Sequence, residues 1–411
     1  MKRFALILTA LVPALLIVGA AAGAGPRVVG APETVFDWAS QRCATWDIPD
    51  GPARAWRDAD GSVRLIAGAE RNRIAAGADL DHLRHDCAVV FEGARSADPG
   101  AHDDRSWIAG LFTPDGRRVE ALVHAEYHGD KHPGRCPAAV YLDCWRNAVV
   151  AAVSEDGGGS FAPAGLVAAL PYRYDGLAGR RTGYFNPSNI LRDGDHLYVF
   201  VFAEAYRAQA RGACLLRRPL EGGASDWRAW DGVGFGVRFA DPYREDIIDP
   251  SRHVCAPLPG VGSTISSVVR TAAGTAAGTG TGTGTGGYLA VTPATRDGVS
   301  GIYAMTSPDL VHWSAPELLW AAPLLWRRDC AAEAAYAYPA LLDAASPGFD
   351  SVGDDFWLYV TRMTLGKDCA AGPDRDLIRM RVSWPAADRS PAGSPAPSAA
   401  PPDPPAGFPV P

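Results

Sequence analysis

The sequence lacks any long apolar segment after its first residues. The apolar run from Phe4 to Val18 follows two basic residues and precedes small residues, and no later run is long enough to cross a bilayer. A charged start, an apolar stretch and small residues are typical of a secretory signal peptide, which we expect at residues 1–24. A membrane anchor is the alternative, but no charged segment follows the run to stop transfer. The pattern predicts a secreted or periplasmic protein without a membrane span.

Clustered basic residues are also missing, and the formal net charge is −7. Nucleic-acid binding depends on grouped Lys and Arg side chains that displace counterions, so we expect no nucleic-acid partner. The chain has no Gly-x-x-x-x-Gly-Lys-Ser/Thr loop, no Gly-x-Ser-x-Gly elbow and no His-Glu-x-x-His helix. These absences exclude the motif-defined nucleotide hydrolases, serine hydrolases and zinc proteases.

The 8 cysteines include no C-x-x-C or C-x-x-H unit. A zinc cluster is therefore the weaker interpretation, and an even number of cysteines in an exported chain favours disulfides. Connectivity does not follow from sequence, but pairing neighbours within one structural unit is the economical hypothesis. It predicts four bridges: Cys43 with Cys87, Cys136 with Cys144, Cys214 with Cys255, and Cys330 with Cys369.

Two segments are of low complexity. Residues 271–287 form a Gly-Thr-Ala run between two strand-like segments, which predicts a flexible hairpin loop. Residues 385–411 are mostly Pro, Ala, Ser and Asp, with too little apolar surface to offset the entropy of ordering, which predicts a disordered tail. The remainder, residues 25–384, is interpreted as one domain.

Within that domain, short runs rich in Val, Ile, Leu, Phe and Tyr alternate with Gly, Asp, Asn and Pro, which is typical of strands and turns. Residues 53–68 illustrate the unit, with two apolar runs on either side of the turn Asp58-Ala-Asp-Gly61. Each hairpin is followed by a third strand. The same layout recurs at residues 107–123, 188–202, 263–291 and 340–360. We therefore predict an all-β, five-bladed β-propeller of four-stranded antiparallel blades.

Turns that follow the third strands share an acidic residue and an aromatic residue. In Ser154-Glu-Asp-Gly-Gly-Gly-Ser-Phe161 and Ser307-Pro-Asp-Leu-Val-His-Trp313, the carboxylate is expected to accept backbone N–H bonds and fix the turn. The first resembles the Asp box of sialidase-type propellers. The second is similar to a blade turn of five-bladed glycoside hydrolases of the arabinanase, xylosidase and invertase group.

The strand openings carry the same resemblance. Asp50-Gly-Pro-Ala-Arg54, Asn186-Pro-Ser-Asn189 and Tyr338-Pro-Ala resemble the Asp-Pro-Ser openings of that group, where a carboxylate stands beside a central funnel. The resemblance implies that Asp50 occupies the place of the general base and that Arg54 binds a carboxylate or a sugar hydroxyl. The alternative is an ordinary loop in which the carboxylates accept turn hydrogen bonds.

Glycoside hydrolysis uses two carboxyl groups, one as proton donor and one to activate water or attack carbon. Asp104 opens the second unit and is a candidate to orient the acid, or to belong to a solvated loop. Strand alternation places His124, Glu126 and His128 on one face, where Glu126 could donate a proton with imidazole support. The same three residues suit a metal site, and a polar edge strand is the third interpretation.

Glu333 is a second candidate proton donor, close to the opening of the fifth unit. Asn186 and Asn189 could bind sugar hydroxyls, or make turn hydrogen bonds. Tyr338 and Trp107 could offer flat faces to a sugar, although aromatic residues more often belong to the core.

We hypothesise an exported glycan-active propeller, a glycoside hydrolase whose carboxylates come from different blades. A non-catalytic propeller that binds glycan or protein is the first alternative, and a metal-dependent enzyme using His124, Glu126 and His128 is the second. We expect a carbohydrate ligand, a monomer, no required cofactor, and room for a structural calcium in the central channel.

Overall fold

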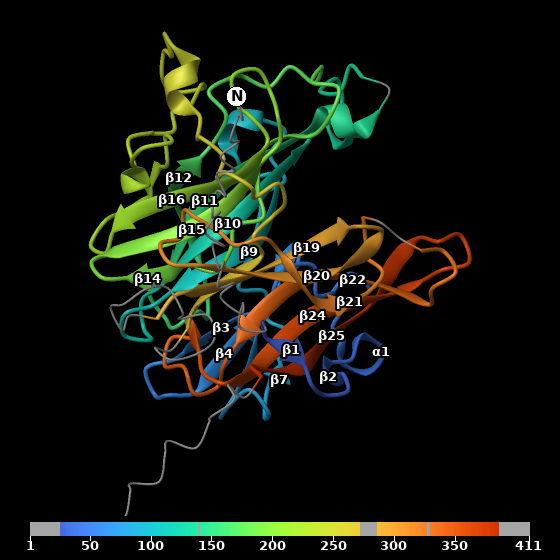
Figure 1. The fold of residues 1–411 in the computed structure, drawn as a ribbon. Coiled ribbons are helices and arrows are strands. Elements are labelled where there is room, and N and C mark those ends of the chain that lie inside the picture. Colours follow the sequence, from blue (N-terminus) through green and yellow to red (C-terminus); the bar gives the residue numbers. More distant parts are fainter. Residues whose placement is uncertain (1–24, 139, 272–285, 327–328, 386–411) are drawn as a thin grey trace, which may run out of the picture.

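The computed structural model describes residues 25–138, 140–271, 286–326 and 329–385 (Figure 1). The predicted signal peptide, nearly all of the Gly-Thr run and nearly all of the tail lie outside these residues. The described chain is almost entirely strand and loop, so the all-β prediction is confirmed. Its one α-helix is α1 (Trp38–Gln41), and there are short 3₁₀ turns at Pro99–Ala101, Gly129–Lys131, Tyr141–Cys144, Ala224–Asp226 and Pro250–His253. None of its helices has the length and apolar character needed to cross a membrane.

The first sheet has four strands in the order β3-β4-β6-β7. Two further strands of the same part of the chain, β5 and β8, pair with each other as a separate two-stranded sheet. The bounds are β3 (Arg54–Arg57), β4 (Val63–Ile66), β5 (Arg71–Asn72), β6 (Ala75–Gly77), β7 (Arg84–His85) and β8 (Phe91–Glu92).

The second sheet has nine strands, seven of them in the order β17-β16-β15-β13-β11-β10-β9, with β12 on β11 and β14 on β15. A short parallel pairing of Arg146 with Thr182 and Asn147 with Gly183 joins its two antiparallel halves. The bounds are β9 (Arg105–Phe112), β10 (Val119–His128), β11 (Trp145–Ser154), β12 (Ala162–Ala168), β13 (Thr182–Phe185), β14 (Leu191–Asp193), β15 (His196–Ala203), β16 (Gly212–Pro219) and β17 (Arg228–Ala229).

Two five-stranded sheets complete the fold. One has the order β21-β20-β19-β18-β23, and the other has the order β1-β25-β24-β22 with β2 on β25. The bounds are β1 (Arg27–Val28), β2 (Glu33–Phe36), β18 (Ser267–Thr271), β19 (Tyr288–Arg296), β20 (Val299–Ser307), β21 (Glu317–Ala321), β22 (Ala334–Leu342), β23 (Ser351–Val352), β24 (Asp355–Leu365) and β25 (Ala371–Ser383).

All five hairpins predicted from the sequence are present as antiparallel pairs: β3 with β4, β9 with β10, β14 with β15, β18 with β19, and β22 with β24. The acidic turns are also confirmed: the side chain of Asp156 accepts the N–H of Ser160, and that of Asp309 accepts the N–H groups of Val311 and His312. The strands do not separate into five four-stranded sheets, because the pairing of β11 with β13 merges two of the predicted units.

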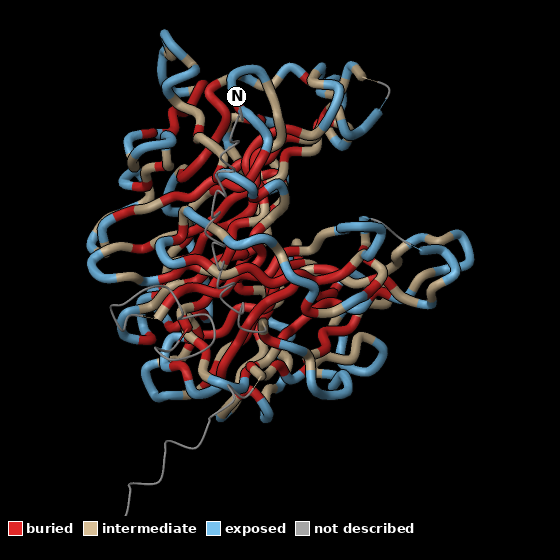
Figure 2. Tube along the Cα trace, viewed as in Figure 1, coloured by how far each residue is buried: buried red, intermediate tan, exposed pale blue. Residues whose placement is uncertain are grey.

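Buried positions are concentrated along the strands, and exposed positions in the connecting loops (Figure 2). The buried apolar residues form five clusters, and each lies between two hairpin units. Trp56 of the first unit packs with Ile108 of the second, and corresponding clusters join the second to the third, the third to the fourth and the fourth to the fifth. The fifth cluster contains Leu65 together with Tyr359, so the last unit packs against the first. Inner strands such as β15 are apolar on both faces because both faces are covered.

The four predicted disulfides are all present with the predicted partners: Cys43–Cys87, Cys136–Cys144, Cys214–Cys255 and Cys330–Cys369. Each bridge links segments of one unit or adjoining loops. In a chain-entropy account, each such bridge contributes on the order of 2–4 kcal/mol by restricting the unfolded chain.

Candidate active site

A cavity of about 310 Å³ lies where the starts and ends of several strands meet. Asp50 enters it from the loop before β3, Glu126 from β10, Tyr338 from β22 and Arg375 from β25. Its lining also includes a second guanidinium group, that of Arg181, and a set of aromatic or amide-bearing side chains: Trp107, His124, Trp145, Asn147, Phe185, Asn186 and Trp326. The cavity therefore combines two carboxylates, two guanidinium groups and an aromatic wall.

Asp50 is held by groups from the last unit of the fold. Its Oδ1 accepts a hydrogen bond from the Tyr338 hydroxyl at 3.1 Å and one from the Arg375 guanidinium. Its backbone N–H donates to the carbonyls of Ala67 and Gly68, which fixes the loop against the end of β4. The carboxylate is thus oriented by two side-chain donors while 24% of its side chain remains exposed to the cavity.

Burial raises the pKa of Asp50 above its ordinary value. Arg375 and Tyr338 favour the ionised form and oppose this rise, whereas the nearby Glu126 adds to it by charge repulsion. A carboxylate with a raised pKa is a stronger base once ionised, and two carboxyl groups that influence each other are the arrangement acid–base chemistry requires.

Glu126 lies between two histidines of its own strand. Its Oε2 is 2.8 Å from Nε2 of His128, and its Oε1 is 3.6 Å from Nε2 of His124. Alternation along β10 puts the three side chains on one face, as predicted. The Glu126 side chain is 12% exposed, so it reaches the cavity while most of its surface is covered.

The hydrogen bonds around His124 assign its neutral tautomer. The Asn147 side-chain amide donates to the Thr182 carbonyl, so the Asn147 oxygen accepts from Nε2 of His124 at 2.9 Å. Burial lowers the pKa of His124, and Arg181 and His128 lower it further against the opposing effect of Glu126. His124 is therefore a neutral donor that fixes the floor of the cavity.

Two residues of the cavity have strained backbones. Tyr338 has φ of 59° and Asn186 has φ of 50°, a region that asparagine tolerates and tyrosine seldom adopts. At Tyr338 the register of β22 against β24 shifts between Ala337 and Ala340, so the strand bulges there. A bulge redirects a side chain, and here it brings the Tyr338 hydroxyl to Asp50. Strain of this kind costs about 1–3 kcal/mol and is concentrated at functional sites.

An aromatic wall faces the carboxylates. Trp107, Trp145, Phe185 and Trp326 line the cavity, and the guanidinium of Arg181 lies over three of these rings, at 5.4 Å from Trp145, 4.7 Å from Phe185 and 5.6 Å from Trp326. The Trp326 side chain is largely exposed. Flat rings beside hydrogen-bonding groups suit a ligand with both apolar and polar faces.

Of the predicted site residues, Asp50, Glu126, Trp107, Asn186 and Tyr338 line this cavity together. His128 lies directly behind Glu126 and stacks beside Trp145, with ring centroids 4.9 Å apart. The structure therefore brings together six of the ten side chains chosen from the sequence.

Asp104 does not line the cavity. Its buried carboxylate accepts the backbone N–H of His128 at 2.8 Å and lies 3.1 Å from Nε2 of His132. Asp104 therefore fixes the end of β10 at His128. The prediction that Asp104 faces the central cavity is wrong. A carboxylate that follows a turn can satisfy backbone groups on its own side of the strand, and that local demand decides here.

Arg54 is buried and binds no carboxylate or ligand-facing group. Its guanidinium donates to the carbonyls of Ala109 at 2.6 Å, Ser266 at 2.7 Å and Pro187 at 3.4 Å, and burial lowers its pKa to about 9. It links the first unit to the next three. Carbonyl oxygens are ligands that calcium prefers, so a calcium ion at this place would have to displace Arg54.

Asn189 and Glu333 lie away from the cavity. Asn189 donates to the Val268 carbonyl at 2.7 Å and accepts from its N–H at 2.8 Å, which ties the third unit to the fourth. Glu333 is exposed, and its backbone carbonyl accepts the N–H of Leu365. Both positions differ from the predicted site, because turn and edge hydrogen bonds determine them.

His124, Glu126 and His128 do not gather their ligand atoms as a metal site would. In the described part of the chain, the three side chains whose ligand atoms come together within 4.8 Å are Cys43, Asp47 and His85, and the Cys43 sulfur is in a disulfide. Nε2 of His124 is hydrogen-bonded to Asn147 instead.

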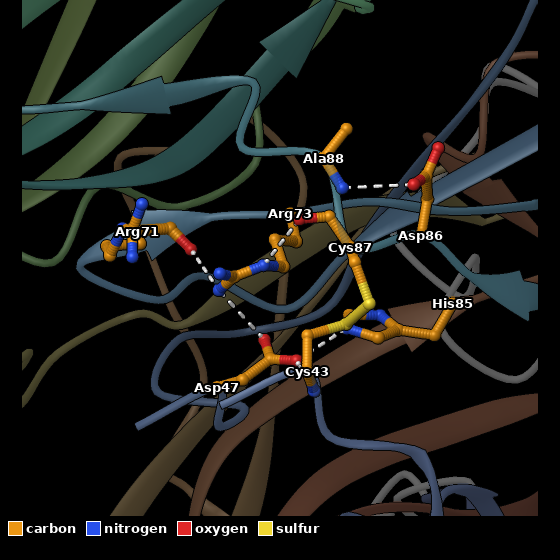
Figure 3. Close-up of a disulfide and its surroundings, with 8 residues drawn as sticks. All are labelled: Cys43, Asp47, Arg71, Arg73, His85, Asp86, Cys87 and Ala88. Atoms are coloured by element: carbon orange, nitrogen blue, oxygen red, sulfur yellow. Dashed lines mark hydrogen bonds and ion pairs between the residues drawn. A yellow bond between two sulfur atoms is a disulfide. The ribbon is translucent and has the colours of Figure 1, made fainter. Parts of the chain in front are cut away.

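A second charged cluster lies under the Cys43–Cys87 disulfide (Figure 3). The Asp47 carboxylate lies 2.8 Å from Nε2 of His85 and 3.3 Å from Nη1 of Arg73, and it accepts the Cys43 N–H at 2.8 Å. Burial alone would raise the pKa of Asp47, but these hydrogen bonds and charges outweigh it and lower the pKa. Both carboxylate oxygens are engaged by these three groups and 4% of the side chain is exposed, so we interpret this cluster as structural.

No protein-family model matches the chain, and no curated protein matches its sequence.

The solved structures that the chain resembles include glycoside hydrolases. The catalytic domain of a GH62 alpha-L-arabinofuranosidase from Coprinopsis cinerea has 10% identity and a TM-score of 0.44, with 86% of this chain and 97% of that one covered. An alpha-L-arabinanase mutant from Cellvibrio cellulosa has 12% identity and a TM-score of 0.43, with 80% and 90% covered. An alpha-L-arabinofuranosidase from Podospora anserina has 10% identity and a TM-score of 0.44, with 86% and 96% covered. At this distance, function has to be argued from the residues of the chain itself.

Sequence reasoning missed Arg375 and Arg181 at this site. Arg375 is in the last strand and is 325 positions from Asp50, its partner. Neither arginine belongs to a recognisable motif, so no local signal could have found them. Asn147 pairs with His124 across two adjacent strands, and a register argument from the hairpin could have located it.

Proposed function

We propose that the protein is a glycoside hydrolase in which Asp50 and Glu126 are the two catalytic carboxyl groups. The observation that carries this proposal is that the two carboxyl groups lie in one cavity, are electrostatically coupled, and come from different units, Asp50 from the loop before β3 and Glu126 from β10. Glycosidic bond cleavage requires such a pair, one member protonated and the other ionised.

The roles follow from their partners. Arg375 and Tyr338 both donate to Asp50 and stabilise its ionised form, so Asp50 is the base that activates water or attacks carbon. Glu126 is the proton donor, with the His128 imidazole 2.8 Å from its Oε2 as the group that can resupply a proton. The aromatic wall gives the sugar rings a flat surface to lie against.

We also propose that the five hairpin units close into a five-bladed propeller. The five core clusters between successive units support this, and so does the cluster that joins the last unit to the first. The contacts of Asp50 with Tyr338 and Arg375 cross the same junction. Closure of a propeller leaves only short sheet edges, which limits the aggregation of an all-β chain.

Four disulfides support a location outside the cytoplasm, in keeping with the predicted signal peptide. We propose a secreted or periplasmic monomer that acts on carbohydrate. Mass spectrometry of the protein exported by its native host should find the mature N-terminus near Gly25.

The test is a screen of purified protein against a panel of polysaccharides and oligosaccharides, with release of reducing ends as the readout. We expect at least one substrate for the wild type, and loss of activity in Asp50→Asn and Glu126→Gln. Glu333→Gln is the matched control, because it removes an exposed carboxylate outside the cavity. Full activity in Glu126→Gln, or loss in Glu333→Gln only, would contradict the assignment.

The largely exposed Trp326 beside the cavity favours a second candidate, a module that binds glycan without cleaving it. Such a module would bind an oligosaccharide equally well with Asp50 and Glu126 replaced, and would release no reducing ends. Calorimetric titration of the wild type and both variants separates the two functions.

A further inference from the structure

The candidate active site continues into a second cavity of about 280 Å³. The two share a boundary that includes Arg181, Phe185, Asn186, Trp326 and Tyr338. Beyond that boundary the second cavity is lined by residues of the third, fourth and fifth units, among them Phe202, Arg211, Thr264, Thr295 and Tyr336. Because the cavities adjoin, one extended ligand can occupy both.

Arg181 lies at this boundary with most of its hydrogen-bonding capacity unused. A guanidinium has five N–H donors, yet within the described residues Arg181 donates no hydrogen bond and makes a single ion pair, to Glu204 at 3.6 Å. Its side chain is 27% exposed. The aromatic rings of Trp145, Phe185 and Trp326 surround the guanidinium and restrict its orientation without satisfying its donors.

The other two arginines of the joined cavities are engaged. Arg375 donates to Asp50. Arg211 donates to Glu204 at 3.0 Å and to the Gly262 carbonyl at 3.0 Å. Glu204 therefore balances only one of the two charges of Arg181 and Arg211, and this part of the cavity keeps a net positive charge.

We propose, resting on the proposed function, that the joined cavities bind an acidic glycan and that Arg181 binds its anionic group. An oxyanion, either the carboxylate of a uronic acid or a sulfate ester, accepts two parallel N–H bonds from a guanidinium. The low exposure of the site weakens competition from water and salt. A neutral sugar would leave the positive charge of this region unbalanced.

This charge is placed to oppose the repulsion from the catalytic carboxylates. Asp50 and Glu126 would disfavour an anion in the first cavity, and Arg375 is already committed to Asp50. Arg181 is close enough to lower the pKa of His124, which lies beside Glu126. The anionic group would therefore lie at Arg181, where the two cavities meet, and the rest of the ligand could extend into the first cavity toward Asp50 and Glu126.

The test measures binding by calorimetry in the Glu126→Gln background, so that no ligand is consumed. The probes are a trigalacturonide, its carboxyl-reduced neutral counterpart and a sulfated neutral galacto-oligosaccharide. We expect an anionic probe to bind about tenfold or more tightly than the neutral one at low salt, the size of a charge-assisted hydrogen bond. Preference for the carboxylate probe identifies a uronic acid, and preference for the sulfated probe identifies a sulfate ester.

Arg181→Gln should reduce the anionic preference to within about twofold. Arg244→Gln is the matched control, because Arg244 also makes one ion pair at 3.6 Å, to Asp241, and lies outside both cavities. Equal binding of the anionic and neutral probes by the parent protein, or an unchanged preference in Arg181→Gln, would overturn the proposal.

Failure of this proposal and failure of the hydrolase assignment give different results. If the protein prefers an anionic probe but cleaves no glycan, the proposal of an acidic ligand is supported and the proposal of a hydrolase is contradicted. If the protein cleaves a neutral glycan and shows no anionic preference, the proposal of a hydrolase is supported and the proposal of an acidic ligand is contradicted.

Discussion

Asp47 and Asp50 lie three positions apart in one loop, and their environments have opposite effects on them. Asp47 is sealed under a disulfide with its oxygens shared among His85, Arg73 and the Cys43 N–H, and its pKa is lowered. Asp50 faces a cavity, and its pKa is raised by burial and further by repulsion from Glu126. The comparison shows that a carboxylate becomes available for chemistry when its surroundings leave it incompletely satisfied.

The largest expected effect comes from Asp50→Asn. We expect cleavage of the substrate found in the panel to fall by about 10²–10⁴-fold, because the base is lost while its shape is kept. The melting temperature should stay nearly unchanged, because the raised pKa of Asp50 shows that the burial of its charge outweighs the attraction of Arg375, and Tyr338 can still donate to the amide oxygen. Initial rates and thermal unfolding of the same preparation measure both. A folded variant with wild-type rates would show that Asp50 is no more catalytic than Asp47.

Asp47→Asn should do the opposite. It leaves the buried Arg73 without its counter-charge, and breaking a buried pair in this way costs about 3–5 kcal/mol of unfolding free energy. Urea unfolding should show the loss, with the rate per folded molecule retained. Asp79→Asn, at a turn where the carboxylate is 48% exposed, is the control and should leave the free energy of unfolding nearly unchanged. Equal stability of the two variants would refute the structural role of Asp47.

The two aspartates should also differ in their response to pH. The lowered pKa of Asp47 means that its stabilisation is present above the unfolded value of 3.8 and is lost as pH falls through the folded value. The raised pKa of Asp50 places the acidic limb of the rate profile above pH 3.8. Arg375→Gln should move that limb to higher pH, because Arg375 lowers the pKa of Asp50.

Rates and unfolding free energies measured from pH 3 to 8 would check these directions. A limb that Arg375→Gln moves to lower pH would contradict the assignment of Asp50 as the ionised base. In Asp47→Asn, the part of the acid-induced loss of stability that comes from protonation of Asp47 should be absent. Asp50→Asn keeps Asp47 and should therefore still show it.

Tyr338→Phe is expected to have the smallest effect. It removes one hydrogen bond to Asp50, worth about 1 kcal/mol, and should lower kcat/KM by about fivefold. Tyr288→Phe removes a hydroxyl that donates to another aspartate, Asp193, at 2.8 Å outside both cavities, and should leave the rate unchanged. The same loss in both variants would mean that the hydrogen bond to Asp50 does not control the rate.

Much of the local structure could be predicted. The five hairpins and the acidic turns follow from apolar runs and turn residues that are close in sequence, and the four disulfides link neighbouring segments. The shared face of His124, Glu126 and His128 follows from strand alternation alone. The nine-stranded sheet could not be anticipated, because it depends on two parallel residue pairs between β11 and β13, which belong to different predicted units.

Site prediction worked less evenly. Asp50 and Glu126 line one cavity, as expected from their places at a strand opening and a strand end, and their catalytic role stays a prediction. Asp104 and Arg54 were placed wrongly, since each satisfies buried backbone groups that the sequence does not display. Buried backbone N–H and C=O groups need hydrogen-bond partners, and here the side chains of Asp104 and Arg54 are those partners.

The sequence by itself determined an all-β chain of five hairpins with paired cysteines, because turn chemistry, strand alternation and the proximity of neighbours act over short spans. The tertiary structure decided which charged groups meet. Arg375 reaches Asp50 across 325 positions, and Tyr338 reaches it across 288. A pKa depends on burial and on the charges within a few ångströms, and packing the last unit against the first is what brings those charges to Asp50.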